Sequence, residues 1–297
     1  MKPIRLINRI EFKGPNLIKG LEFEGNRCLG KLEDFCKIYS KHNFDEFFFY
    51  DIVASLYDQD FSFDTLKKFS SFFSVPVTYC GGIRTIKDIE KALNCGAEKV
   101  SINTHLFKDK SFLKDAVNNF GSPTLISNIE YYFDGHKYLL LTEFGRTKIE
   151  NYDFFDWIDF LNDNEIGEIH LLDVTKDGLG EDPDIEFINK ILSKVNMPVV
   201  YGCGLGDKSK YLELSKNTNL SGISAASIFH YDIHLDSNSP FASYEGPDLR
   251  KGKEIDSGNI EFTKYGYGGF RDLFVNPISI GDLKKYLFDN GVNVRIS

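Results

Sequence analysis

The chain has 297 residues, 42% of them hydrophobic and 27% charged, which is typical of a globular protein. The formal net charge of −9 excludes a nucleic-acid-binding footprint, and no apolar run approaches membrane-spanning length. The first ten residues lack the apolar core of a signal peptide. Five scattered cysteines without a CxxC pair predict reduced thiols in a cytoplasmic protein. We therefore expect no nucleic-acid or membrane partner, no metal and no cofactor.

Eight strand-like runs alternate with helical patterns along the chain. Helical patterns are clear at 32–42, 86–96 and 184–195, and a last helix is expected at 280–291. Strict alternation of strands and helices predicts a parallel sheet, and eight such units close it into a (β/α)8 barrel over residues 1–297. The strand-like runs lie near 5–11, 46–51, 76–80, 98–103, 124–130, 168–173, 198–202 and 221–226.

Two segments interrupt this alternation. Residues 131–144 predict a small hairpin around Asp134-Gly135, after the fifth strand. Residues 232–275, rich in Gly, Ser, Pro and Asp, predict an insertion in the loop between the eighth strand and the last helix. That loop lies on the rim where barrel enzymes bind substrate, so "YGYGGFRD" (265–272) is either an aromatic-bearing lid or part of a tolerated surface loop.

The two halves of the chain repeat each other. "VPVTYCGGIR" (75–84) is echoed by "MPVVYGCGLG" (197–206), about 120 residues later. Three more pairs of segments follow the same order, so we infer a duplicated half-barrel. These pairs are 47–55 with 169–177, 99–104 with 222–227, and 8–14 with 127–133.

The duplication places glycines and small polar residues twice on the C-terminal rim of the strands. Backbone amides at glycine turns and helix N-termini bind phosphate, so the two clusters predict a ligand with a phosphate at each end. The alternative is that these glycines only connect strands to helices, and a single cluster would favour it. One cluster is Gly81, Gly82, Asn103 and Thr104, and the other is Gly202, Gly204, Ala226 and Ser227.

These ordered segments resemble the cyclase subunit of imidazole glycerol phosphate synthase, over about 1–230 and again about 276–295. The resemblance is carried by "RLINRIEFKGPNLIKG", "DEFFFYDIVAS", "VPVTYCGGIRTIKDIEKALNCGAEKVSIN", "GEIHLLDVTKDGLG" and "AASIFH". It implies a barrel of two phosphate-binding halves with a glutaminase subunit docked on its N-terminal face. Ammonia then passes through the barrel and attacks a ribulosyl-aminoimidazole-carboxamide nucleotide, giving imidazole glycerol phosphate and an aminoimidazole carboxamide ribotide.

The resemblance also implies an ammonia gate at the lower end of the barrel. The family closes this end with a salt-bridged ring, which matches Arg5, Glu46, Lys99 and Glu168 here. Two positive and two negative charges neutralise one another in the interior, where an unpaired charge is costly. The alternative is an ion-pair plug that only stabilises the base of the barrel.

The predicted catalytic pair departs from the family pattern. The family uses two aspartates as general acid and base, and the matching residues here are Glu11 and Glu130. The extra methylene moves each carboxylate by about 1 Å, and a misplacement of that size costs about a hundredfold in rate. Further candidates for the substrate site are Arg9, Lys19, Asp51, Asp177 and Gly178.

The predicted lumen is more polar than that of the family. Strand alternation turns Arg9, in place of a small family residue, toward the interior, where we expect it to pair with a glutamate. Tyr50, Asn128 and His170 are also expected to face inward, and His170 is given no role. The two glutamates and the polar lumen leave a second interpretation open. In it, the chain is a divergent paralogue that passes ammonia to another acceptor, such as a sugar-amidating ligase of bacterial surface polysaccharide synthesis.

Overall fold

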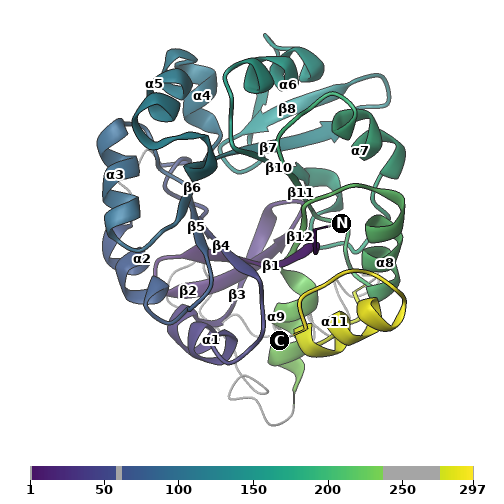
Figure 1. Cartoon of the computed structure of the whole chain (residues 1–297). Coiled ribbons are helices and arrows are strands. Elements are labelled where there is room, and N and C mark those ends of the chain that lie inside the picture. The colour runs from purple at the N-terminus through teal and green to yellow at the C-terminus, as the bar shows by residue number, and fades with distance from the viewer. Residues whose placement is uncertain (1, 58–61, 237–274, 297) are drawn as a thin grey trace.

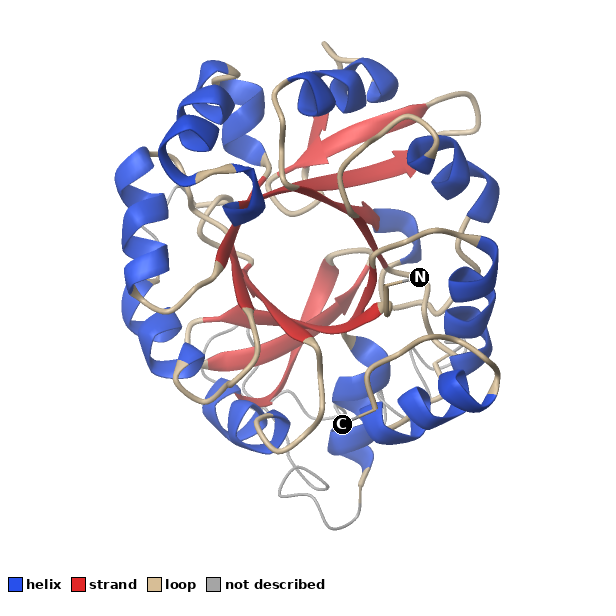
Figure 2. Cartoon of the chain, viewed as in Figure 1, coloured by secondary structure: helices blue, strands red, loops and turns tan. Residues whose placement is uncertain are grey.

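The computed structural model describes residues 2–57, 62–236 and 275–296. Within these residues, eight parallel strands surround a common axis and the helices lie outside them (Figure 1 and Figure 2). The barrel strands are β1 (Arg5–Lys13), β4 (Glu46–Asp51), β5 (Val77–Cys80), β6 (Lys99–Ile102), β7 (Leu125–Phe133), β10 (Glu168–Asp173), β11 (Val199–Gly202) and β12 (Gly222–Ala225). β1 pairs with β4 and β12, and β7 pairs with β6 and β10, so the ring closes. The predicted (β/α)8 architecture is confirmed.

The four helices expected from the sequence are present, and α3, α7 and α11 among them begin after a residue whose side chain caps the helix. Thr85 and Asp88 form a capping box at the start of α3, and the side chain of Ser279 caps α11. The described helices are α1 (Leu32–Tyr39), α2 (Phe63–Ser70), α3 (Ile86–Asn94), α4 (Thr104–Lys108), α5 (Ser111–Phe120), α6 (Phe154–Asp163), α7 (Ile185–Leu192), α8 (Lys208–Asn217), α9 (Ser227–Leu235) and α11 (Ile280–Asp289). Single 3₁₀ turns occur at η1 (Ser122–Thr124) and η2 (Val174–Lys176).

Hairpins extend two of the strand-to-helix loops at the C-terminal rim. The predicted hairpin is formed by β7 with β8 (Tyr138–Thr142), and β9 (Thr147–Ile149) adds a further antiparallel strand. A second hairpin, β2 (Asn16–Leu21) with β3 (Glu24–Lys31), follows β1 and was not expected. Because β1 and β7 occupy matching places in the two halves, the loops repeat as well as the barrel.

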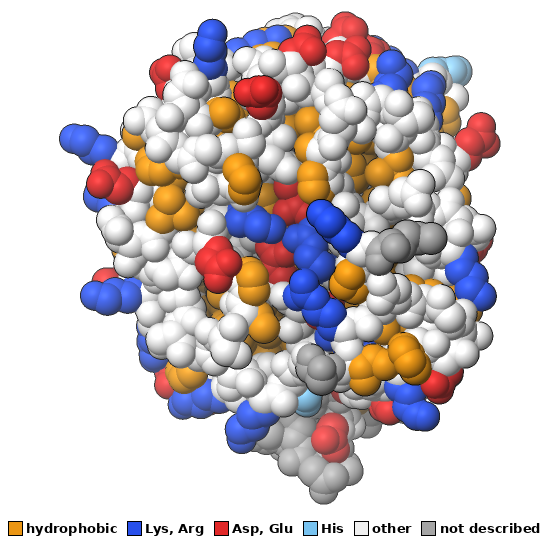
Figure 3. Space-filling view, in the orientation of Figure 1, with side chains coloured by type: hydrophobic (Ala, Val, Ile, Leu, Met, Phe, Trp, Pro, Cys, Tyr) orange, Lys and Arg blue, Asp and Glu red, His pale blue; other side chains and the backbone are white. Residues whose placement is uncertain are grey.

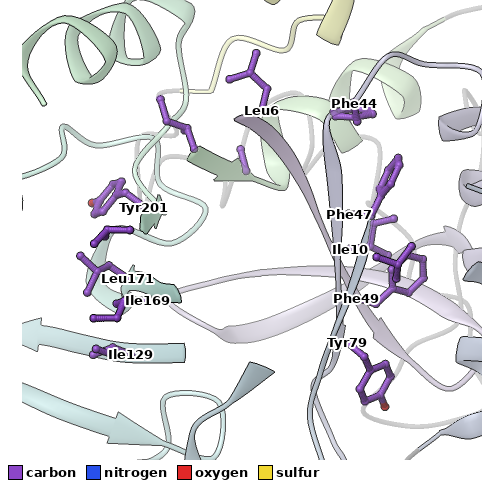
Figure 4. Packing of buried hydrophobic residues seen from close by; sticks show 14 of the residues in the cluster. Leu6, Ile10, Phe44, Phe47, Phe49, Tyr79, Ile129, Ile169, Leu171 and Tyr201 are labelled. Carbon is purple, nitrogen blue, oxygen red and sulfur yellow. The ribbon is translucent and has the colours of Figure 1, made fainter. Parts of the chain in front are cut away.

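The hydrophobic residues form two layers. Outward-facing strand residues such as Leu6, Phe47, Ile169 and Tyr201 pack between the barrel and the helices (Figure 4). A smaller cluster, which includes Ile7, fills the barrel interior. This alternation of outward and inward side chains along each strand is the one that the period of two predicts.

Most of the predicted insertion, 237–274 with its YGYGGFRD stretch, lies outside the described residues. α9 continues to Leu235, so residues 232–235 are helical, and Ile233 and His234 are buried. No helix in the described part of the chain is long and apolar enough to cross a membrane.

Candidate functional site

The four residues predicted for the gate lie together at the N-terminal end of the barrel. Arg5 contacts Glu168 and lies 2.5 Å from Glu46, while Lys99 lies 3.2 Å from Glu46 and 2.9 Å from Glu168. The hydroxyl of Thr78 adds a hydrogen bond of 2.8 Å to Glu46. Each carboxylate therefore has two cationic partners, which compensates the loss of hydration inside the barrel.

A broad cavity opens beside this ring. It has a volume of about 1010 Å³, and Arg5, Lys99 and Glu168 belong to its wall together with the N-terminal residues 2–4 and the C-terminal residues 291–293. Figure 3 shows basic and acidic side chains gathered over the centre of this side of the barrel. The ring is thus reachable from the surface on the N-terminal face.

At the opposite end, four charged side chains form a buried cluster. Arg9 contacts Asp177, and its Nε lies 2.9 Å from Glu11. The Lys19 ammonium, carried by the β2–β3 hairpin, lies 3.0 Å from Glu11 and 2.6 Å from Asp177. All four side chains are at most 2% exposed. The expected pairing of Arg9 with a glutamate is present, and two cations balance two carboxylates.

The charges of this cluster depend on one another. Burial disfavours the ionised form of Asp177, but Lys19 and Arg9 together hold the pKa of this carboxyl below its usual value. Burial likewise opposes the charge of Lys19, and the carboxylates of Asp177 and Glu11 raise the pKa of the ammonium nevertheless. Removal of any one member would leave an uncompensated buried charge.

Glu130 has a different environment. Its side chain is 4% exposed, and burial raises its pKa to about 7 against the opposing effect of the Gly145 amide and the Asn103 side chain. The Gly145 amide donates to Oε2 at 2.7 Å, and Asn128 donates to Oε1 at 3.1 Å. Glu11 on β1 and Glu130 on β7 stand on opposite sides of the strand order, as the duplication predicts.

Glu130 lines a small cavity in the first half of the mouth. The cavity has a volume of about 50 Å³, and its wall includes Asp51, Gly81, Gly82, Asn103 and Thr104. Gly81 has φ +116° and its added Cβ would lie 2.5 Å from the Asp51 carbonyl, so only glycine fits this turn. Asp51 itself accepts hydrogen bonds from the Val53 and Ala54 amides, both at 3.2 Å, which anchors the strand end.

A second cavity of about 20 Å³ lies in the other half of the mouth. Arg9, Asp177, Gly178, Gly204, Ala226 and Ser227 belong to its wall. α9 begins at Ser227, and helix geometry leaves the amides of Ser227 and Ile228 without a partner inside the helix, whereas the Phe229 amide donates to the Ala226 carbonyl at 3.1 Å. The Gly204 amide donates to the Lys176 carbonyl at 3.2 Å, and Gly202 is not part of this wall. The structure thus groups three of the four residues of the second predicted cluster.

Two residues absent from the predicted site close the mouth. Phe23, from the β2–β3 turn, stacks on Phe144, from the β8–β9 turn, with ring centroids 4.3 Å apart. Both are buried, and the guanidinium of Arg9 lies 5.6 Å from the centre of the Phe23 ring. In both turns a Glu-Phe dipeptide has positive φ, Glu22-Phe23 in one and Glu143-Phe144 in the other. This repeated dipeptide is the sequence signal that could have identified the two phenylalanines.

No group of three or more potential metal ligands was found among the described residues, and all five cysteines are free thiols. The site can thus offer three carboxyl groups, Glu11, Asp177 and Glu130, the last with a pKa near neutrality, together with two cations and two small cavities beside glycine turns. These groups suit proton transfer on an anionic ligand held at both ends.

Comparison with known proteins places this arrangement in a family. A sequence profile described as "Histidine biosynthesis protein" matches residues 11–234. The imidazole glycerol phosphate synthase subunit HisF of Staphylococcus saprophyticus is 32% identical over 228 residues, covering 76% of this chain and 90% of the relative. HisF of Legionella pneumophila is 33% identical over 212 residues, 71% of this chain and all of the relative, and HisF of Buchnera aphidicola is 29% identical over 77% of this chain and 91% of the relative. Because both kinds of match span most of the chain, the protein belongs to the histidine biosynthesis protein family.

Proposed function

We propose that the chain is the cyclase subunit of an imidazole glycerol phosphate synthase. In this proposal it uses ammonia to convert a ribulosyl-aminoimidazole-carboxamide nucleotide into imidazole glycerol phosphate and an aminoimidazole carboxamide ribotide. The observation that carries the proposal is the position of Glu130. This carboxyl, with a pKa of about 7, lines one of two cavities that lie in opposite halves of the same barrel mouth.

The two cavities suit a ligand with a phosphate at each end. The Ser227 and Ile228 amides, at the start of α9, suit one phosphate in the second cavity. Gly82, Asn103 and Thr104 surround the other in the first cavity. The reacting carbons of the nucleotide would then lie between the cavities, beside Glu130.

Glu130 is suited to exchange protons near neutral pH. A group with a pKa close to the working pH is present in both protonation states and serves as acid or base. Glu11 supplies the second carboxylate from the opposite side of the mouth. Its contacts with Arg9 and Lys19 fix its position, and an incoming anionic ligand can recruit either cation.

Ammonia would be delivered from the other end of the barrel. We propose that a glutaminase subunit covers the N-terminal face, over the cavity of about 1010 Å³ that the ring of Arg5, Lys99 and Glu168 borders. Ammonia would enter beside Lys99, whose side chain is 21% exposed, the most exposed of the four ring residues. Five free thiols suit a reducing compartment, and we propose a cytoplasmic location.

The test supplies ammonium and the ribulosyl nucleotide to the purified chain and measures imidazole glycerol phosphate. We expect turnover by the parent, a loss of about 10²-fold or more in the Glu11→Gln and Glu130→Gln variants, and a modest change when both glutamates become aspartate. Glu130→Gln keeps the side-chain volume, so its loss reports on the carboxylate, whereas Glu11→Gln also leaves the charges of Arg9 and Lys19 less compensated. A parent that neither binds nor converts the nucleotide contradicts the proposal and points to a different ammonia acceptor.

A further inference from the structure

A chain of four hydrogen bonds crosses the barrel interior and ends on Glu130. Oγ of Ser224, on β12, lies 2.7 Å from Nε2 of His170 on β10. Nδ1 of His170 lies 2.7 Å from the hydroxyl of Tyr50 on β4. This hydroxyl donates to Oδ1 of Asn128 at 2.9 Å, and Nδ2 of Asn128 donates to Oε1 of Glu130 at 3.1 Å. All five side chains are buried, so the chain joins four strands away from bulk water.

The donors of this chain all point toward Glu130. The Tyr50 hydroxyl has one proton and gives it to Asn128, so it accepts from Nδ1–H of His170. His170 is neutral because burial, together with the positive charges of Arg9 and Arg5, holds its pKa well below the usual range. A neutral imidazole has one N–H, so Nε2 accepts the proton of the serine hydroxyl.

Neighbouring residues of the barrel interior leave space for this hydrogen-bond chain and pack around it. Gly202, on β11, faces the histidine, and a Cβ added there would lie 2.5 Å from Oγ of Ser224 and 3.2 Å from Nε2 of His170. The ring of Phe48 meets the imidazole edge-on with centroids 4.8 Å apart. Any side chain at position 202 would push apart the two groups that begin the chain.

We propose that Asn128, Tyr50 and His170 are positioning residues for Glu130, which hold its Oε1 as a hydrogen-bond acceptor while the Gly145 amide holds Oε2. A carboxylate held in this way presents its proton-exchanging face in one orientation, and linked donors strengthen one another when they run in one direction. The catalytic task of Glu130 rests on the proposed function, whereas its positioning does not.

Other groups also face Glu130 and influence its pKa. Arg9 from β1 and Arg146 from the turn after β8 lower the pKa of this carboxyl, as do Asn103 and the Gly145 amide, whereas burial raises it to about 7. Cys80 faces the Tyr50 hydroxyl, and burial keeps the pKa of this thiol above its usual value, so it stays neutral. Weakening the donor chain should therefore move the titration of Glu130 further upward.

The experiment combines two NMR measurements on the ligand-free chain with one kinetic profile. Imidazole ¹⁵N shifts report the tautomer of His170, and side-chain ¹³C shifts report the titration of Glu130. We expect the Nδ1–H tautomer in the parent. In Tyr50→Phe we expect the proton to move to Nε2, toward Ser224, and the pKa of Glu130 to rise by about one pH unit, because its donor Asn128 is no longer fixed.

The control is Tyr211→Phe, which removes a buried tyrosine hydroxyl on α8, outside the barrel lumen. It should leave the tautomer and the titration unchanged. Ser224→Ala, at the far end of the hydrogen-bond chain, is the second variant if Tyr50→Phe does not fold. It should keep the Nδ1–H tautomer, because the Tyr50 hydroxyl remains its acceptor, and raise the pKa of Glu130 by less than Tyr50→Phe does. The apparent pKa in the pH dependence of kcat for imidazole formation should shift with the pKa of Glu130 in each variant.

An Nε2–H tautomer in the parent would overturn the proposal, as would a Tyr50→Phe protein in which the His170 tautomer and the Glu130 titration are those of the parent. The NMR measurements test the positioning of Glu130 even if the protein has no imidazole-forming activity. A parent that lacks imidazole-forming activity but shows the Nδ1–H tautomer and the upward shift contradicts the proposed function alone.

Discussion

Phe23 and Phe144 stack face to face at 4.3 Å although they come from opposite halves of the chain. Phe23 lies in the β2–β3 turn and Phe144 in the β8–β9 turn, in the hairpins that follow the first strand of each half, β1 or β7. Phe144 lines the first cavity, and Phe23 covers Arg9, which lines the second. The stack therefore links the residues around the first cavity to those around the second.

A double-mutant cycle measures this stack. We expect Phe23→Leu and Phe144→Leu each to destabilise the chain, and the two together to show a coupling of about 0.5–1.5 kcal/mol, the usual range for an aromatic pair. Chemical unfolding of the parent, both single variants and the double variant gives this number. Purely additive effects would mean that the two hairpins do not pack together in solution.

The ion-pair ring gives a prediction about coupling to a glutaminase. Lys99→Ala leaves Glu46 and Glu168 with Arg5 as the remaining partner and widens the entrance. In the assembled enzyme we expect glutamine hydrolysis to continue while product formed per glutamine falls several-fold, because ammonia escapes. The measurement is the ratio of glutamate to imidazole product, with free ammonium added to restore turnover.

The matched control for the ring is Lys284→Met, which breaks a buried lysine–carboxylate pair with Asp45 outside the lumen, 3.0 Å in length. It should lower stability but keep the ratio at the parental value. If Lys99→Ala also changes only thermal stability, the ring is a structural plug and not a gate.

The cluster around Arg9 predicts a pH-dependent loss of stability. Arg9→Ala leaves two buried carboxylates with one lysine, and such breaks cost about 3–5 kcal/mol. The loss of stability should be largest above neutral pH and shrink as the pH falls, because Asp177, which loses one of the two cations that lower its pKa, can then be protonated. Chemical unfolding at pH 8 and pH 5 tests this, and a loss independent of pH would contradict the charge argument.

The barrel was predictable because its signals are local and repeated. The alternation of strands and helices and the duplicated glycine segments predict the order of elements. The period of two along each strand predicts that Arg9, Tyr50 and His170 face inward. The turn that joins β1 to β2 also has a sequence signal. Gly14-Pro15 separates Lys13 from Asn16, which pair directly, so a two-residue turn joins β1 to β2.

The partners inside the site were not predictable in the same way. Lys19 reaches Glu11 only because the hairpin folds back over the mouth. Tyr50 meets His170 because of the relative stagger of strands across the closed barrel, which the alternation within one strand does not specify. Sequence patterns thus predict which face a residue is on, whereas contacts across the lumen depend on the closed geometry.

The two cavities predict anion binding at both ends of the mouth. Phosphate or sulfate should raise the melting temperature with concentration, because ligands that bind only the folded state stabilise it. Ser227→Asp should weaken this effect by repelling an anion from the second cavity, and Thr104→Asp should do so in the first. Crystals grown in sulfate should show one anion in each cavity, and two empty cavities would count against a bis-phosphate ligand.

The buried carboxyl of Glu130 predicts how stability depends on pH. Burial raises its pKa from 4.5 to about 7, so between these values the folded state holds a proton that the unfolded state has lost. This contribution is fully present below pH 4.5 and disappears as the pH rises through about 7, and its size is about 3 kcal/mol. Glu130→Gln keeps the volume but cannot ionise, so its free energy of unfolding should fall less than that of the parent between pH 5 and pH 8. Urea unfolding of both proteins across this range gives the difference, with Glu90→Gln on the surface of α3 as control. Parallel curves for the parent and the Glu130→Gln variant would mean that the carboxyl is ionised throughout and titrates as an exposed glutamate does.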